Sequence, residues 1–174
     1  MEFKDLIKIR RSVRAYCGAP DHDELVQILT EAQQAPSWKN SQTTRWYVVE
    51  SPEKLEELRL ALHPINQKKV DNAAMIVSTY VRNIAGFTKE EPDNEVGNGW
   101  GAYDLGLHDA YLLLAARNAG YDTLIMGLRD GAKIREILSI PENEEVLSVI
   151  AVGKGAEEPA LRPRKDLNEI ARFL

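Results

Sequence analysis

The segment Trp100–Asn118, WGAYDLGLHDAYLLLAARN, decides the fold class of this 174-residue chain. Its centre, from Ala110 to Ala116, carries apolar residues on nearly every side of a predicted helix. A helix of that kind has to be buried over most of its surface. In so short a chain we expect either a central helix of the core or a helix packed across a subunit interface, and the sequence alone favours neither.

Helices and strands alternate on both sides of this segment. Helices are predicted over 2–10, between Asp21 and Pro36, and from the Ser51-Pro52-Glu53 start onward. Strands are predicted over 46–49, 73–81, 123–126 and 146–152, which are rich in small and β-branched residues. The pattern indicates a single α+β or α/β domain over 1–174 with a modest sheet. Residues 83–99 are predicted to be one long loop, a kind of segment that often covers a binding site.

Composition excludes several classes of protein. A formal net charge of -5 argues against a general nucleic-acid-binding protein, which usually has a basic domain. One cysteine and three histidines, without CxxC or HExxH spacing, exclude a zinc framework and a disulfide-stapled secreted fold. The chain has no apolar signal segment near its start and no apolar run of about 18 residues. We therefore expect a cytoplasmic protein that binds neither nucleic acid nor membrane.

The basic stretch Lys8-Ile9-Arg10-Arg11-Ser12-Val13-Arg14 is the first candidate site. Grouped arginines with a serine suit a phosphate or another delocalised anion, because guanidinium donors are fixed and always charged. An exposed basic helix end explains the same residues equally well, since the helix dipole favours cations in the last turn. The excess of positive charge is confined to this stretch of an otherwise acidic chain, so a small anionic ligand is a better match than a polymer.

Two further polar clusters are ambiguous when taken singly. Pro36-Ser37-Trp38-Lys39-Asn40-Ser41-Gln42 offers the mixed donors and acceptors that recognise the edge of a heterocycle, although a turn after a helix needs the same residue types and is favoured on its own. Arg162-Pro163-Arg164-Lys165 taken alone is a solvated basic tail. The glycine-rich run over 97–101 follows a polar loop rather than a strand, so it does not support a dinucleotide-binding fingerprint.

The order of these pieces along the chain resembles the nitroreductase family of FMN-dependent oxidoreductases. The resemblance extends from Phe3 to about Ile170. It rests on Arg-Arg-Ser-Val-Arg near the start, Ala-Pro-Ser-x-x-Asn-x-Gln further on, the long helix ending in Asn118-Ala119-Gly120-Tyr121, then Ile125-Met126-Gly127, Val152-Gly153 and Pro163-Arg164-Lys165. The first two motifs are specific in combination, and the later ones support the resemblance by position.

The resemblance implies an α+β flavoprotein fold: a central mixed, mainly antiparallel sheet flanked by helices, in a homodimer with FMN at the interface. It implies cofactor-binding residues of three kinds. Arg10, Arg11, Ser12 and Arg14 of one subunit would hold the phosphate, ribityl chain and one flavin edge, with Arg164 and Lys165 adding phosphate contacts. Pro36, Ser37, Asn40 and Gln42 would come from the partner subunit. Ile125, Met126 and Gly127 would lie against the ring.

Elementary chemistry agrees with this assignment. The FMN phosphate carries nearly two negative charges, which gives two distant basic clusters a reason to converge. Arg10 or Arg14 near flavin N1 and O2 would stabilise the reduced anionic ring. On this interpretation the 100–118 helix is the dimer core, although an ordinary internal helix stays equally compatible with the sequence.

Some residues depart from the family pattern. Trp38 and Lys39 stand where small residues are common, so we expect them to shrink or charge the substrate space. Thr43-Thr44 replaces the usual proline and aromatic residue. Leu128 replaces a second glycine after Gly127, which affects the approach of the backbone to the flavin.

The predicted activity is ping-pong hydride transfer from NAD(P)H through FMN to an oxidised acceptor such as a nitroaromatic or a quinone. No side chain need act as acid, base or nucleophile, and none is named as catalytic. Two other functions stay open. One is a flavin store or sensor in which Trp38 and Lys39 close the substrate face. The other is an adaptor that uses residues 8–14 as a basic patch.

Overall fold

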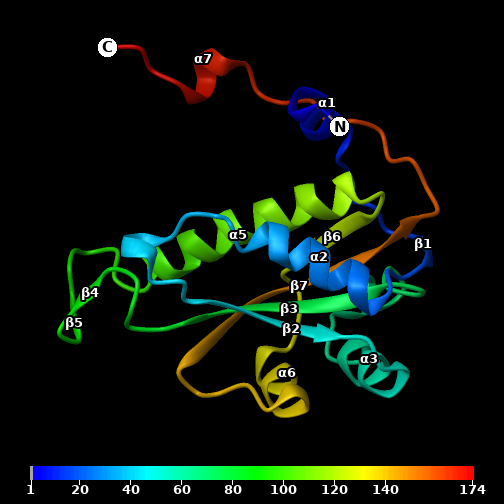
Figure 1. The fold of residues 1–174 in the computed structure, drawn as a ribbon, viewed down its shortest axis with the longest axis horizontal. Helices are drawn as coiled ribbons and strands as arrows, with labels where there is room; N and C mark the ends of the chain where they lie inside the picture. The colour runs from blue at the N-terminus through cyan, green and yellow to red at the C-terminus, as the bar shows by residue number, and fades with distance from the viewer. Residues whose placement is uncertain (1) are drawn as a thin grey trace.

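The computed structural model describes residues 2–174, which form one larger sheet with helices on both of its faces (Figure 1). The helices are α1 (Phe3–Ile9), α2 (His22–Ala32), α3 (Pro52–Arg59), α4 (Pro64–Gln67), α5 (Gly99–Asn118), α6 (Gly131–Leu138) and α7 (Leu167–Ile170), with a short 3-10 helix η1 (Trp38–Asn40). The strands are β1 (Tyr16–Gly18), β2 (Thr44–Val49), β3 (Ala74–Val81), β4 (Phe87–Thr88), β5 (Glu91–Pro92), β6 (Asp122–Met126) and β7 (Glu144–Gly155).

Strand β7 organises the five-stranded sheet. It pairs antiparallel with β3 on one side, with β6 on the other, and with β1 near its end, while β2 pairs with the free side of β3. An isolated parallel bridge between Ser12 and Thr123 makes the sheet mixed. The predicted α+β class with a mixed, mainly antiparallel sheet is therefore confirmed.

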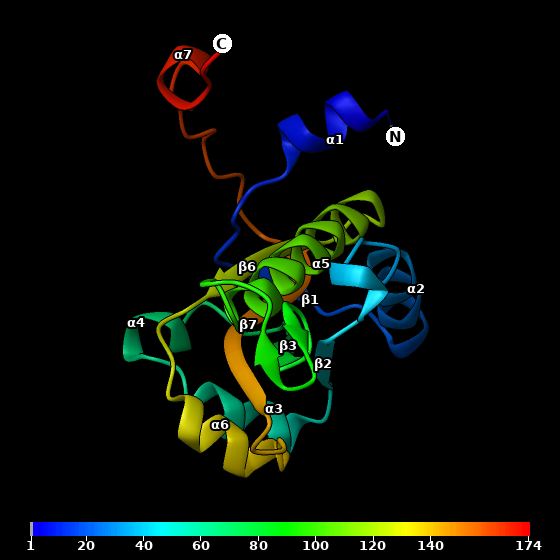
Figure 2. The ribbon, with the colours of Figure 1, turned by 90° about the vertical axis from the view of Figure 1, so that its left-hand side faces the viewer.

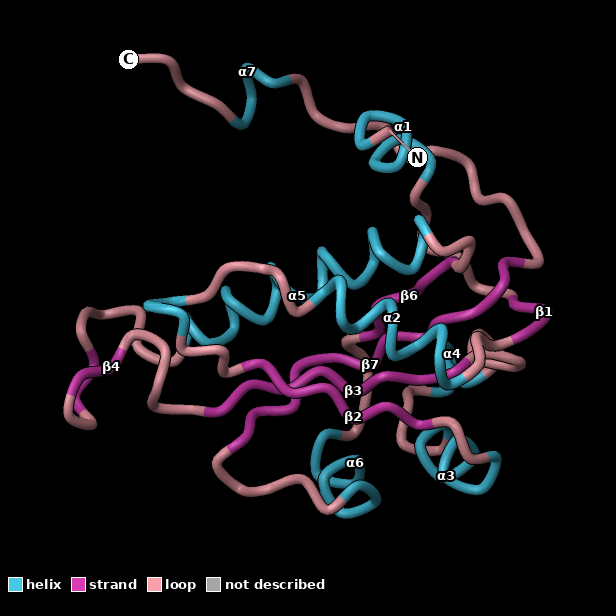
Figure 3. The backbone as a smooth tube through the Cα atoms, in the orientation of Figure 1, coloured by secondary structure: helices cyan, strands magenta, loops and turns pink. Residues whose placement is uncertain are grey.

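Helices cover the two faces of the sheet and enclose a hydrophobic core on each (Figures 1 and 3). On one face α2 and α5 contribute Leu25, Ile28 and Leu112. On the other face α3 and α6 contribute Leu58 and Ile134. Strand β3 is buried along nearly its whole length because both of its faces are covered.

Helix α5 is buried on one side only. Leu105, Leu112 and Ala116 point to the core, whereas Tyr103 and Tyr111 are exposed. One chain therefore does not provide the all-round burial that the sequence of this helix demands.

Two helix starts follow the predicted chemistry. Asp21 caps α2: its carboxylate accepts from Glu24 N, and the Glu24 carboxylate accepts from Asp21 N. Ser51 caps α3, with Pro52 at the first helical position. Local signals thus set the ends of both helices.

The prediction of one long loop over 83–99 was wrong in part, because β4 and β5 form a small hairpin inside it. Strands of two residues are too short to show an alternating pattern, so the sequence could not reveal them. Strand β1 and helices α4, α6 and α7 were also not predicted, and all are short.

Both ends of the described chain project beyond α5, on the side of that helix away from the sheet, and they are separate from each other (Figures 1 and 2). Helix α1 and residues 156–174, called the C-terminal arm below, carry exposed large apolar side chains. These are Phe3, Ile7, Leu161, Leu167, Ile170 and Phe173. Within the described residues, none of the helices has the length and apolar character needed to cross a membrane.

Candidate functional site

The basic N-terminal cluster lies beside β6. Helix α1 ends at Ile9, and Arg10 is its C-cap residue. The backbone then runs along β6, where Val13 N donates to the carbonyl of Thr123 at 3.1 Å. The Val13 side chain is buried in the core and fixes this stretch, so the neighbouring polar side chains lie at a defined edge of the sheet.

The C-terminal arm is attached to the same place. Ala156 N donates to the carbonyl of Ala15 at 2.8 Å, and Arg14 N donates to Glu157 Oε1 at 2.7 Å. These two bonds direct residues 159–164 across the basic cluster. The tertiary structure thereby brings together two basic segments from opposite ends of the chain.

A cavity of about 450 Å³ lies between these two segments. Its polar lining comes from Arg10, Arg11, Ser12, Arg14, Arg162 and Arg164. None of the described residues that line it is acidic. Burial, followed by the charges of Arg164 and Arg11, lowers the pKa of Arg10 below its usual value. Arginines held together without a counter-ion form a site for a strong anion.

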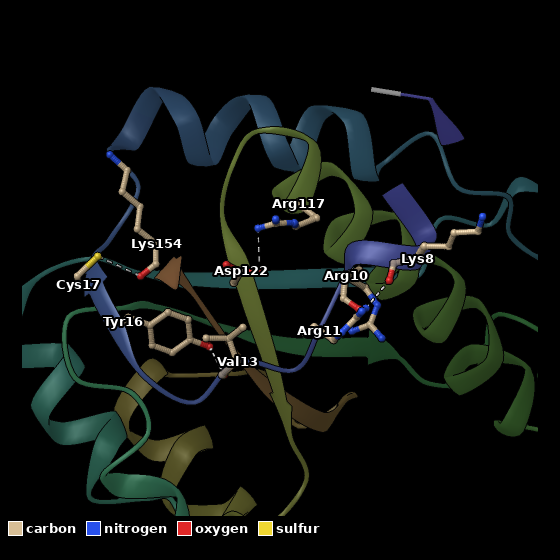
Figure 4. A network of polar contacts seen from close by, with 9 residues as sticks. All are labelled: Lys8, Arg10, Arg11, Val13, Tyr16, Cys17, Arg117, Asp122 and Lys154. Atoms are coloured by element: carbon tan, nitrogen blue, oxygen red, sulfur yellow. Dashed lines mark hydrogen bonds and ion pairs between the residues drawn. The ribbon is translucent and has the colours of Figure 1, made fainter. Parts of the chain in front are cut away.

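Arg11 also has a structural role. Its Nη1 donates to the carbonyl of Arg10 at 2.9 Å and to that of Lys8, near the end of α1 (Figure 4). These bonds agree with the interpretation of Arg11 as part of a basic helix end, and its role in binding an anion stays a prediction. Lys165 follows Arg164 in the arm but is not among the residues that line the cavity.

The second cluster, 36–42, lies near the start of α5. Trp38 N donates to Asp104 Oδ2 at 2.8 Å, and Gln42 N donates to Ser37 Oγ at 3.1 Å. Burial raises the pKa of Asp104, and the bond from Trp38 opposes that shift. Lys39, Asn40 and Gln42 all have positive φ, at 47°, 55° and 49°. Three non-glycine residues with positive φ within four positions make this a strained segment, which the contacts around it hold in place.

The two clusters are far apart within one chain. Arg11 and Arg117 line a common cavity of about 480 Å³ at the end of α5, while the 36–42 segment contacts Asp104 near its start. At a rise of about 1.5 Å per residue, Asp104 and Arg117 are separated by roughly 20 Å along the helix. Figure 1 shows the two regions at opposite ends of α5. One chain does not bring its own predicted site residues together.

The Ile125-Met126-Gly127 segment lies at the end of β6, on the strand that the basic cluster borders. Met126 is buried, whereas Ile125 and Leu128 are exposed. Nothing lies within 4 Å of where a Cβ on Gly127 would be, so the surface there is open. Ile125 near the end of β6 and Leu128 just after the strand are large exposed apolar side chains, which offer a surface for a flat ring.

Two residues near this turn were not found from the sequence. Asn66, in the four-residue helix α4, is buried and donates from Nδ2 to the carbonyl of Leu128 at 3.3 Å. Lys69 Nζ donates to Asn66 Oδ1 at 3.2 Å. A four-residue helix is too short to show a periodic pattern of apolar residues, so the polar residue types were the only signal that the sequence offered here.

Comparison with known proteins gives consistent results. A family model described as "Nitroreductase family" matches residues 7–154. The chain is 30% identical over 205 residues to the CLA biosynthesis enone reductase of Lactiplantibacillus plantarum, covering 99% of this chain and 94% of that protein. It is 31% identical over 166 residues to the NADPH-flavin oxidoreductase of Vibrio harveyi, covering 92% and 68%. The crystal structure of a candidate nitroreductase from Exiguobacterium sibiricum in complex with FMN is 25% identical, with a TM-score of 0.89 and coverage of 100% and 98%.

Proposed function

The chain belongs to the nitroreductase family, and from this premise we propose that two copies of it form an FMN-dependent oxidoreductase. The enzyme uses NAD(P)H as the electron donor and reduces an oxidised small molecule such as a nitroaromatic or a quinone. The observation that carries the proposal is the cavity lined by five arginines and no acid. We also propose that residues 1–174 make up one domain, whose two cores share one sheet.

The residues present fit FMN. Arg10, Arg14 and Arg164 supply charge-assisted donors for a phosphate that carries nearly two negative charges. The exposed side chains of Ile125 and Leu128 provide an apolar surface for the ring system. The proposed cofactor-binding set is Arg10, Arg11, Ser12, Arg14, Pro36, Ser37, Asn40, Gln42, Ile125, Met126, Gly127, Arg164 and Lys165, to which we add Asn66 and Lys69.

The separation of the two clusters along α5 supports a homodimer. Because Asn40 and Gln42 lie near the start of the helix and the arginines near its end, a second copy is needed to complete one site. Helix α5 offers a surface for that copy in the row formed by Tyr103, Leu107, Ala110 and Leu114, called the α5 seam below. The seam follows coiled-coil spacing and is exposed or half-buried in one chain.

A second apolar surface continues the seam. A groove of about 560 Å³ lies between α1, α2 and α5, with apolar lining from Phe3, Leu6, Tyr111 and Leu114. The C-terminal arm projects from the body and carries Leu167, Ile170 and Phe173 exposed (Figure 2). We propose that the second copy covers these surfaces, because apolar areas of this kind are normally buried in an interface.

FMN, when bound, supplies a two-electron redox centre between donor and acceptor. The balance for a nitro compound is NAD(P)H + H⁺ + R–NO2 → NAD(P)⁺ + R–NO + H2O, in which NAD(P)H supplies the hydride and solvent supplies the proton. The side chains of this chain need only bind and orient the groups. The basic cluster holds the phosphate, and a cation at Arg10 or Arg14 favours negative charge on the neighbouring ring edge.

The acceptor does not follow from family membership. One relative is named as an enone reductase and another as a flavin oxidoreductase, so the family serves different acceptors. A flavin store or sensor is the second candidate, favoured by the contact between the tilted rings of Trp38, in the 36–42 cluster, and Trp100.

An absorption spectrum of the purified protein, before and after anaerobic NADH or NADPH, tests the proposal. We expect a yellow protein whose flavin is bleached rapidly and recovers its colour on addition of a quinone. Binding of FMN without rapid bleaching would favour the store or sensor. A colourless protein that takes up no FMN on reconstitution would refute the proposed function.

A further inference from the structure

We propose that Trp38, Lys39 and Trp100 form an acceptor-binding wall that selects flat aromatic acceptors carrying a carboxylate. The inference rests on the proposed function, in which Asn40 and Gln42 contact the flavin. Trp38 and Lys39 precede Asn40 directly, so the wall borders the face on which an acceptor would stack. Trp38 and Lys39 stand where small residues are common in the family, and Trp100 contacts Trp38.

The two indole rings are held in place. Their centroids are 4.6 Å apart at an interplanar angle of 46°. The Trp38 backbone is fixed to Asp104, and Trp100 Nε1 donates to Asn94 Oδ1 at 3.0 Å. On its other side Trp100 lies against Gly86, where a Cβ would come within 2.4 Å of the indole, so the absence of a side chain there permits the contact. The rings form a preorganised aromatic surface, which favours stacking of a flat ligand.

Tyr103 extends this surface. Its ring is edge-on to Trp100 at 5.7 Å between centroids, and its side chain is exposed.

Lys39 supplies the positive charge. Its ammonium lies 5.6 Å from the centre of the Trp38 ring and 3.5 Å from Asp93 Oδ2 in the β4–β5 region. The Lys39 side chain is 67% exposed, against 22% for Asp93. An exposed pair at this distance contributes little, about 0–1 kcal/mol. Lys39 can therefore leave Asp93 for a ligand carboxylate that is partly shielded from water between aromatic rings.

The charge on Lys39 distinguishes two acceptors of the same shape. 4-Nitrobenzoate and 4-nitrobenzamide are both flat and carry the same nitro group, and they differ in net charge. One charge-assisted hydrogen bond predicts a preference for the benzoate of about tenfold or more. Asp93 competes for the ammonium, so D93N should increase that preference, and K39R should retain it.

The experiment measures both compounds with wild-type protein, K39M, D93N and K39R, each loaded with FMN. Two readouts are taken: kcat/KM with NAD(P)H, and the dissociation constant from quenching of tryptophan fluorescence without NAD(P)H. For each variant, the value measured with 4-nitrobenzoate is compared with the value measured with 4-nitrobenzamide as a ratio. A general change in activity or folding affects both values equally and leaves the ratio unchanged. K39M should lower the ratio from about tenfold to about one.

The matched control is K133M, which removes the same charge from α6 on the opposite face of the sheet and should leave the ratio at the wild-type value. A wild-type ratio near one, in a protein whose bound FMN is bleached by NAD(P)H, overturns the inference and leaves the proposed function standing. An unchanged ratio in K39M also overturns it. A protein that binds no FMN overturns both.

Discussion

At the scale of single residues, Asp109 shows how the protonation state of a buried carboxyl affects the stability of the fold. Its side chain is 5% exposed, and Oδ1 accepts from Trp46 Nε1 at 3.1 Å and from Ser78 Oγ at 2.9 Å. Burial raises the pKa of Asp109, and the two hydrogen bonds oppose that shift. A carboxyl whose pKa is higher in the folded than in the unfolded protein stabilises the fold below its unfolded pKa. That contribution is lost as pH rises through the folded pKa.

Asp109→Asn should therefore stabilise the protein relative to wild type at neutral pH. The amide oxygen still accepts both hydrogen bonds, and no charge is buried. The advantage should shrink as pH falls toward 4, where the wild-type carboxyl takes up its proton. Chemical denaturation of both proteins between pH 4 and pH 8 measures it. Asp109→Leu is the contrasting variant: it leaves two donors unpaired and should cost at least about 2 kcal/mol. Equal stability of all three proteins would contradict this account.

Arg10 and Arg164 test the convergence of the two basic segments. Either Arg→Ala change should weaken FMN binding by about tenfold to a hundredfold, the size of one charge-assisted contact. Because both line one cavity, the double variant should depart from additivity by about 0.5 kcal/mol or more. Equilibrium titration with FMN measures the affinity of the wild-type protein, of the two single variants and of the double variant.

The control for this cycle is Arg172→Ala. Arg172 lies in the same arm, donates to the carbonyls of Asn168 and Ala171, and is not among the cavity residues. Its replacement should leave FMN affinity within about twofold. Strictly additive losses at Arg10 and Arg164 would mean that the arm does not share the phosphate site.

At the scale of elements, the packing of α5 on the sheet depends on a close approach. A Cβ added at Gly101 would lie 2.4 Å from the ring of Tyr80, a buried residue of β3. That ring belongs to the strand that pairs with both β2 and β7, so it has little freedom to move. The start of α5, which carries Trp100 and Asp104, is positioned by this contact.

Gly101→Ala should thus lower the free energy of unfolding by about 1–3 kcal/mol, although alanine favours a helix. Gly99→Ala is the matched control, because its Cβ meets only the tip of the Val96 side chain, which can turn aside. That variant should stay within about 1 kcal/mol of wild type. Urea denaturation with an unchanged m-value provides the comparison. If the Gly101→Ala variant is as stable as wild type, the helix is not seated on Tyr80.

At the scale of the whole molecule, the α5 seam and the 36–42 cluster make the site depend on assembly. Ala110 is exposed at the middle of the seam, so Ala110→Glu should leave a single chain folded. In a dimer the same change buries a charge at the interface, which is strongly unfavourable. We expect the variant to shift toward monomer and to lose most of its FMN affinity together. Sedimentation combined with flavin absorbance records both properties.

The control for the seam is Ala132→Glu, the same substitution at an exposed position of α6 on the opposite face of the sheet. It should retain the wild-type mass and flavin content. If Ala110→Glu binds FMN normally as a monomer, one chain is sufficient for the site and the homodimer proposal fails.

Much of the local structure was predictable from the sequence. Asp21 and Ser51 cap helices because their side chains reach backbone donors within three residues. The strands at 74–81 and 122–126 lie within a residue of their predicted limits, since runs of small and β-branched residues favour a buried strand. The β4–β5 hairpin and α4 were not predictable, because a few residues show no period.

The sequence by itself determined which residue types were available: a basic cluster at each end of an acidic chain and an apolar helix between them. Only the tertiary structure decided their arrangement. It brings Arg164 beside Arg10, because hydrogen bonds near Ala15 and Arg14 attach the arm there. It also keeps Asn40 near the far end of α5, because Trp38 is bound to Asp104. Local signals act over a few residues, whereas the distance between two segments depends on the path of the whole chain across the sheet.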